Sequence, residues 1–183
     1  MSYGMSFERA INDLHTEGRS EYARNHQLLD NVPWDYHAFC SEEHPILFTT
    51  GLSSCIGLYC LVDNEGKEQK LPFGYLYHIW TNILIEAQMK SKLLQLKKSI
   101  IELPQENYQK RSFRMGLVYG DGQEEAVPYH VFNLEETFER LYKDLNQSGI
   151  KVKKDTPSYI SRIVIIDPKN KGLVLSKNAT IKQ

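Results

Sequence analysis

Two apolar, aromatic-rich segments around a turn cluster constrain the fold more than any other feature of this chain. Residues 56–62 read Ile-Gly-Leu-Tyr-Cys-Leu-Val, and residues 73–80 read Phe-Gly-Tyr-Leu-Tyr-His-Ile-Trp. Such segments are typical of strands, and the Asp-Asn-Glu-Gly cluster at 63–66 is typical of a turn, so the pattern predicts an antiparallel hairpin. Partner numbers in an antiparallel pair add to a constant. A turn centred beside Gly66 therefore predicts that Cys55 lies opposite His78.

This pairing would bring together a thiol and an imidazole, the two groups that an activated nucleophile requires. Cys55 directly follows Ser53 and Ser54 in a small-residue turn, whose backbone N–H groups could converge on one spot. Such donors lower the pKa of a thiol and stabilise an oxyanion. Thr49 lies six residues before Cys55 on a predicted strand, and its hydroxyl is a candidate for orienting the imidazole.

A structural explanation stands beside the catalytic one. Unmodified cysteine is among the most buried residue types, and a histidine on a strand is usually a packed residue. Cys60 lies five residues after Cys55, so it is expected on the opposite face of the strand, in the core. The lysines at 90–98 are expected to form a solvated helix face.

The rest of the chain supplies further predicted elements. They are strands at 46–50, 113–119 and 150–152, helices from 81 or 82 to 103 and from 133 to 148, and a terminal hairpin at 163–175. Paired strands come from hairpins rather than strand–helix–strand crossovers, which predicts an α+β fold with mainly antiparallel, sandwich-like sheets flanked by helices. Residues 1–45 are predicted to be a helical N-terminal extension packed on the domain, with an irregular connector at 31–45. Residues 46–183 are predicted to form the domain itself.

Composition narrows the function classes. A net charge of −1 gives no basic footprint for nucleic acid, and no apolar run approaches the length of a membrane span. The N-terminus lacks the pattern of a classical signal peptide, and three cysteines without Cys-x-x-Cys spacing argue against disulfides and structural zinc. The six histidines show no metal-binding spacing, so no metal is expected. A reducing cytosol is the expected compartment.

The segment from Thr49 to Leu61 resembles the region around the nucleophile of CheD-type glutamine deamidases. Members of that family have a threonine six residues before a Gly-Ser-Cys turn, then an apolar strand, and then a strand bearing the catalytic histidine. Here Gly74-Tyr75-Leu76-Tyr77-His78 is similar to that second strand. The likeness extends over roughly residues 45–178. This chain has Ser53 where the family has glycine, and a longer loop before the histidine, which points to a protein target other than a chemoreceptor.

The resemblance implies a protein-glutamine deamidase that needs no cofactor. Cys55 would attack a glutamine carboxamide on a protein substrate, His78 would activate the thiol and protonate ammonia, and Thr49 would support the histidine. Because toxins similar to cytotoxic necrotizing factors share this fold, the protein is expected either in the cytoplasm or delivered into a host cell as an effector. Three alternatives stay open: a transglutaminase of the same fold, a non-catalytic protein-binding module, and a Cys-His peptidase. The sequence does not indicate the oligomeric state.

Overall fold

The computed structural model describes the chain in ten stretches. These are residues 29–33, 35–52, 55–62, 73–80, 86–103, 112–120, 129–155, 159–169, 172–175 and 180–181. The sequence also predicts a mostly helical stretch at residues 6–30. Only residues 29 and 30 of it lie within the described stretches, and they belong to a strand, not to a helix. The predicted turn at 63–66 lies outside the described stretches.

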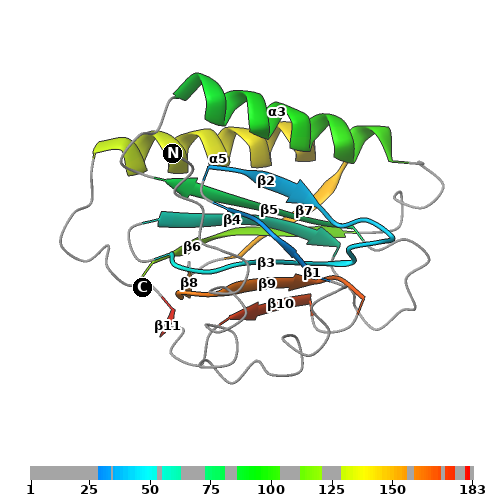
Figure 1. The fold of residues 1–183 in the computed structure, drawn as a ribbon. Coiled ribbons are helices and arrows are strands. Elements are labelled where there is room, and N and C mark those ends of the chain that lie inside the picture. The colour runs from blue at the N-terminus through cyan, green and yellow to red at the C-terminus, as the bar shows by residue number, and fades with distance from the viewer. Residues whose placement is uncertain are drawn as a thin grey trace.

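The described residues form three layers: a pair of helices, a seven-stranded sheet and a four-stranded sheet (Figure 1). The helices are α3 (Glu86–Glu102) and α5 (Tyr129–Gln147). The small sheet has the order β1 (Leu29–Asn31), β3 (Ile46–Thr49), β9 (Val164–Asp167) and β10 (Gly172–Leu175). The large sheet has the order β11 (Thr180–Ile181), β8 (Tyr159–Ile160), β6 (Ser112–Tyr119), β4 (Cys55–Val62), β5 (Gly74–Trp80) and β2 (His37–Phe39), and β7 (Lys151–Lys154) also pairs with β6.

The pairing confirms the predicted α+β class with mostly antiparallel sheets. The hairpin of β4 and β5 and the hairpin of β9 and β10 are both antiparallel. Parallel pairs also occur, between β1 and β3 and between β6 and both β7 and β8, so the sheets are mixed.

The sequence of strand β4 is almost entirely apolar because the strand is buried on both of its faces. All eight of its residues are buried, because helices cover one face of the large sheet and the small sheet covers the other. Its side chains alternate between two cores. Ile56, Leu58 and Cys60 face the helices, whereas Cys55, Tyr59 and Leu61 face the small sheet. The predicted placement of Cys60 on the face opposite Cys55 is therefore confirmed.

The two helices pack on the large sheet through apolar stripes. In α3 the stripe consists of Met89, Leu93, Leu96 and Ile100, and in α5 it consists of Leu134, Phe138, Leu141 and Leu145. Helix α5 begins at Tyr129, before the start that the sequence predicts at residue 133. The helix therefore extends towards its N-terminus as far as the residue after Pro128. A proline within the helix would interrupt its hydrogen bonds.

The predicted irregular connector at 31–45 is wrong in part. Its short strand β2 pairs with β5 in the large sheet, and β1, which begins just before it, pairs with β3 in the small one. The short strands β8 and β11, which pair with each other, were not predicted. Strands of two or three residues are too short for an alternating pattern to reveal them. None of the described helices is long and apolar enough to cross a membrane.

Candidate active site

Cys55 is the first residue of β4 and is held by a tight turn. Its N–H donates to the Leu52 carbonyl at 3.2 Å, and its own carbonyl accepts from the Gly120 N–H at 3.0 Å. The preceding Gly51 has φ 73°, a left-handed conformation that favours glycine. Only 3% of Cys55 is exposed. Since its amide is engaged within the turn, any oxyanion donors must come from elsewhere. The two predicted donors, Ser53 and Ser54, lie outside the described residues.

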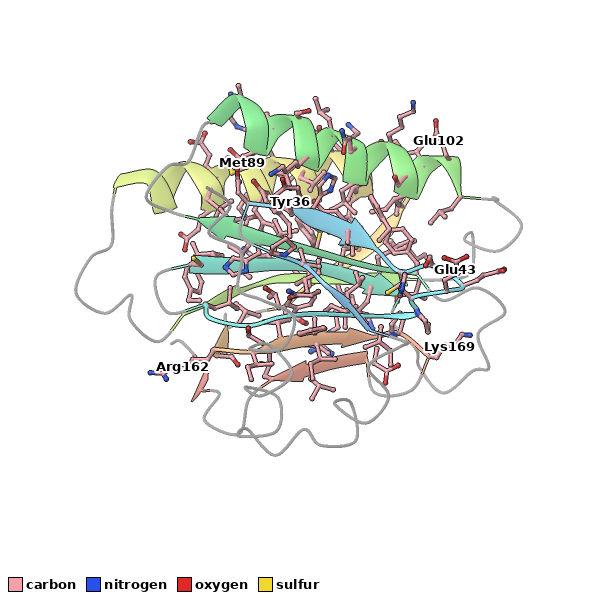
Figure 2. The ribbon with its side chains drawn as sticks, in the orientation of Figure 1. Tyr36, Glu43, Met89, Glu102, Arg162 and Lys169 are labelled. Carbon is pink, nitrogen blue, oxygen red and sulfur yellow. The ribbon has the colours of Figure 1, made fainter. Side chains whose placement is uncertain are left out.

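Leu52 also ties this turn to the bend between β8 and β9. Its N–H donates to the Arg162 carbonyl at 3.3 Å. In Figure 2, Arg162 therefore marks the end of the two sheets that carries the candidate site, and Lys169 marks the opposite end.

His78 lies near Cys55 but not directly opposite it. Cys55 pairs with Trp80, and His78 pairs with Gly57, so the predicted register is wrong by two residues. A shift of two preserves the face of the sheet, because side chains alternate with period two. Cys55 and His78 are thus diagonal neighbours on the face that packs on the small sheet, a relation that in sheets corresponds to about 7–8 Å.

Thr49 reaches the histidine from the other sheet. It is the last residue of β3, and its Oγ1 lies 2.6 Å from Nδ1 of His78. The same hydroxyl donates to the Val32 carbonyl at 2.7 Å. A threonine hydroxyl has one hydrogen, so Oγ1 must accept from Nδ1–H of His78. The neutral tautomer with the proton on Nδ1 follows, and Nε2 carries the lone pair.

Burial keeps this imidazole neutral. His78 is fully buried, and desolvation lowers its pKa from 6.5 to about 4, although the Val32 carbonyl acts in the opposite direction. Its Nε2 has no hydrogen-bond partner among the described residues. A buried polar atom without a partner requires an explanation, and an unprotonated Nε2 is what a general base needs.

These three side chains therefore have the chemistry of a nucleophile, a base and an orienting group. Cys55 and His78 share one face of the large sheet, and Thr49 orients His78 from the small sheet. The other two cysteines are placed differently. Cys60 faces the helices, where burial raises the pKa of its thiol, and Cys40 lies beyond β2. No group of three or more histidine, cysteine or acidic residues within the described stretches is placed to hold a metal ion.

Sequence reasoning missed the segment that borders His78. Val32 provides the carbonyl that binds Thr49, and Asp35 and Tyr36 provide both backbone partners of His78. Lys92 contacts Asp35, and its side chain is only 17% exposed. The prediction that the lysines at 90–98 form a solvated helix face is therefore wrong for Lys92. The sequence contains one clue to this placement. Lys92 lies three residues after Met89 and four before Leu96, so it is on the same side of the helix as the buried apolar stripe.

Comparisons with known proteins add no family. No protein-family model matches this chain, and a search of curated proteins found no match.

Proposed function

We propose that this protein is a cysteine-dependent deamidase that converts a glutamine on another protein to glutamate. The observation that carries the proposal is the state of His78. Thr49 holds its Nδ1, its low pKa keeps it neutral, and its Nε2 is buried without a described partner on the face that also bears Cys55.

The reaction follows from these groups. Nε2 of His78 takes the Cys55 proton while the sulfur attacks the carboxamide carbon. The imidazolium then gives this proton to the departing amine, and ammonia and a thioester result. Water, deprotonated by His78, attacks the thioester. Glutamate is released as the proton returns to the sulfur, so the enzyme needs no other reactant.

The sequence resemblance supports the substrate class. The CheD-type likeness rests on the order threonine, turn, cysteine and histidine along the chain. Thr49 ends β3, Cys55 begins β4, and His78 lies in β5. This likeness favours a protein substrate with an exposed glutamine over a free amide.

Mass spectrometry of lysate proteins incubated with the enzyme in ¹⁸O-labelled water tests the proposal. Hydrolysis of the thioester adds one labelled oxygen, so target peptides gain about three mass units. Glutamines that were deamidated in ordinary water before the incubation differ by only about one unit. We expect the gain with the wild type and with Cys40→Ala, a matched control outside the site, and none with Cys55→Ala.

Other outcomes would redirect the proposal. Amine adducts on glutamine that depend on Cys55 would indicate a transglutaminase, because both reactions pass through one thioester and water access decides between them. New peptide ends that depend on Cys55 would indicate a peptidase. Glutamines unchanged by all three proteins would favour a binding module.

A further inference from the structure

The backbone of His78 is anchored outside the central hairpin. Its N–H donates to the Tyr36 carbonyl at 3.0 Å, and its carbonyl accepts from the Asp35 N–H at 2.8 Å. In a strand both backbone groups of a residue point to the same side, so His78 and Gly57 form a pair without hydrogen bonds between them. The segment at 35–36 therefore provides the hydrogen bonds that fix the backbone of the histidine.

Asp35 has a left-handed backbone conformation at this point. Its φ is 60°, in a region that residues other than glycine rarely adopt, although aspartate and asparagine do so more often than most. The N–H of Asp35 binds the His78 carbonyl, so the contacts that hold Asp35 also help to keep the backbone of His78 in place.

Lys92 of α3 supplies two of these contacts. Its ammonium group donates to the Asp35 carbonyl oxygen and lies 3.3 Å from Oδ1 of the same residue. The hydroxyl of Tyr77, the neighbour of His78, donates to this Oδ1 at 3.2 Å, and the ammonium lies 4.5 Å from the centre of the Tyr77 ring. Figure 2 shows Tyr36 beneath α3, beside the start of β2, where the helix meets the edge of the sheet.

The same segment also orients Thr49. The carbonyl of Val32, three residues before Asp35, accepts the hydrogen of the Thr49 hydroxyl. The oxygen of that hydroxyl is therefore left to accept a hydrogen bond from His78. One short segment thus fixes the backbone of His78 and the partner of its ring.

We infer that Lys92 and Asp35 are positioning residues that hold His78 in its base tautomer beside Cys55. The inference rests on the proposed function, because it assigns His78 the role of base. Lys92 contacts Asp35 and the ring of Tyr77, so its effect on His78 is exerted through Asp35.

Two measurements test this without a protein substrate. One is the tautomer of His78 from ¹H–¹⁵N spectra of its ring, assigned with a His78→Gln protein. The other is the rate at which iodoacetamide alkylates Cys55, followed by mass spectrometry of the Cys55 peptide. In the wild type we expect a single tautomer with the proton on Nδ1.

Lys92→Met keeps a long, unbranched side chain but removes the ammonium group. We expect mixed tautomers and a fall in the alkylation rate of about tenfold or more, because small misplacements of a catalytic group are costly. Lys97→Met is the matched control, since Lys97 lies on the same helix and pairs with Asp144 instead. It should change neither measurement.

Asp35→Asn provides a second test should Lys92→Met fail to fold. Asparagine tolerates the left-handed conformation and keeps an acceptor for Tyr77, so a smaller shift in the same direction is expected. Folded Lys92→Met and Asp35→Asn proteins that match Lys97→Met in both measurements would overturn the inference. Shifts as expected in a protein that deamidates nothing would support the positioning role and count against the proposed function.

Discussion

The hydroxyl of Thr49 has one hydrogen, and its destination determines what His78 can do. It goes to the Val32 carbonyl, so the hydroxyl oxygen can only accept from the imidazole. An asparagine or glutamine amide in this place could present either a donor or an acceptor. A hydroxyl committed to a backbone carbonyl specifies one tautomer.

Thr49→Val should separate this role from packing. Valine matches the shape of threonine but cannot accept from Nδ1–H of His78 or donate to Val32, so buried polar groups lose their partners. We expect a loss of about 1–3 kcal/mol in the free energy of unfolding and at least a tenfold loss of glutamine deamidation. Urea denaturation and the ¹⁸O assay measure the two effects. Thr49→Ser keeps the hydroxyl and should retain most of both, and equal losses in the two variants would contradict the hydrogen-bond argument.

The low pKa of His78 also predicts how stability depends on pH. The pKa is 6.5 in the unfolded chain and about 4 when folded. As the pH falls through this window, the unfolded chain takes up the proton first, so the free energy of unfolding decreases. The contribution is fully present above pH 6.5, and roughly 3 kcal/mol is lost below pH 4.

His78→Gln isolates this contribution, since all other titrating groups remain. Denaturation of both proteins between pH 7 and pH 4 should show a steeper decline for the wild type. Parallel declines would mean that His78 is not buried in its neutral form.

At the scale of elements, strand identity was easier to predict than register. The segments that became β3, β4, β5, β6 and β9 are long enough to show their apolar character. The exact pairing of β4 with β5 depends on the conformation of the loop, which composition does not specify. The face shared by Cys55 and His78 was nevertheless predictable, because an error of two residues leaves side-chain direction unchanged.

The supports of the site could not be predicted because they depend on tertiary contacts. Lys92 looked like one of several lysines on a solvated helix face, and only the packing of α3 against the edge of the sheet brings it to Asp35. Likewise, Val32 acts through its carbonyl oxygen, which every residue possesses. Side-chain chemistry is visible in a sequence, whereas backbone groups that hold a site are not.

At the scale of the whole molecule, the candidate site depends on two sheets packing at a defined distance. Thr49 belongs to the small sheet and His78 to the large one, so their 2.6 Å contact exists only while the layers stay in register. Facing sheets usually lie about 10 Å apart. Gly74 on β5 and Gly57 on β4 both belong to the large sheet and face the small one, and their surroundings differ.

Gly74 lies where the layers leave no room for a side chain. A Cβ there would lie 2.6 Å from Sγ of Cys40, 2.8 Å from Cγ2 of Ile166 and 3.1 Å from Cγ of Pro168. Ile166 lies on β9 of the small sheet, so relief would require the sheets to separate locally. We expect Gly74→Ala to lower the free energy of unfolding by about 1–3 kcal/mol in urea denaturation.

Gly57→Ala is the matched control for this packing argument. A Cβ at Gly57 would meet Leu52, Val164 and Val118 at 3.4–3.7 Å, which is ordinary contact. Alanine also restricts the unfolded chain, so the net change should be smaller than about 1 kcal/mol. Because both substitutions add one methyl group to a buried strand facing the same sheet, their difference measures how tightly the layers close at Gly74. Equal effects at the two positions would mean that strand propensity, rather than the spacing of the layers, determines the cost.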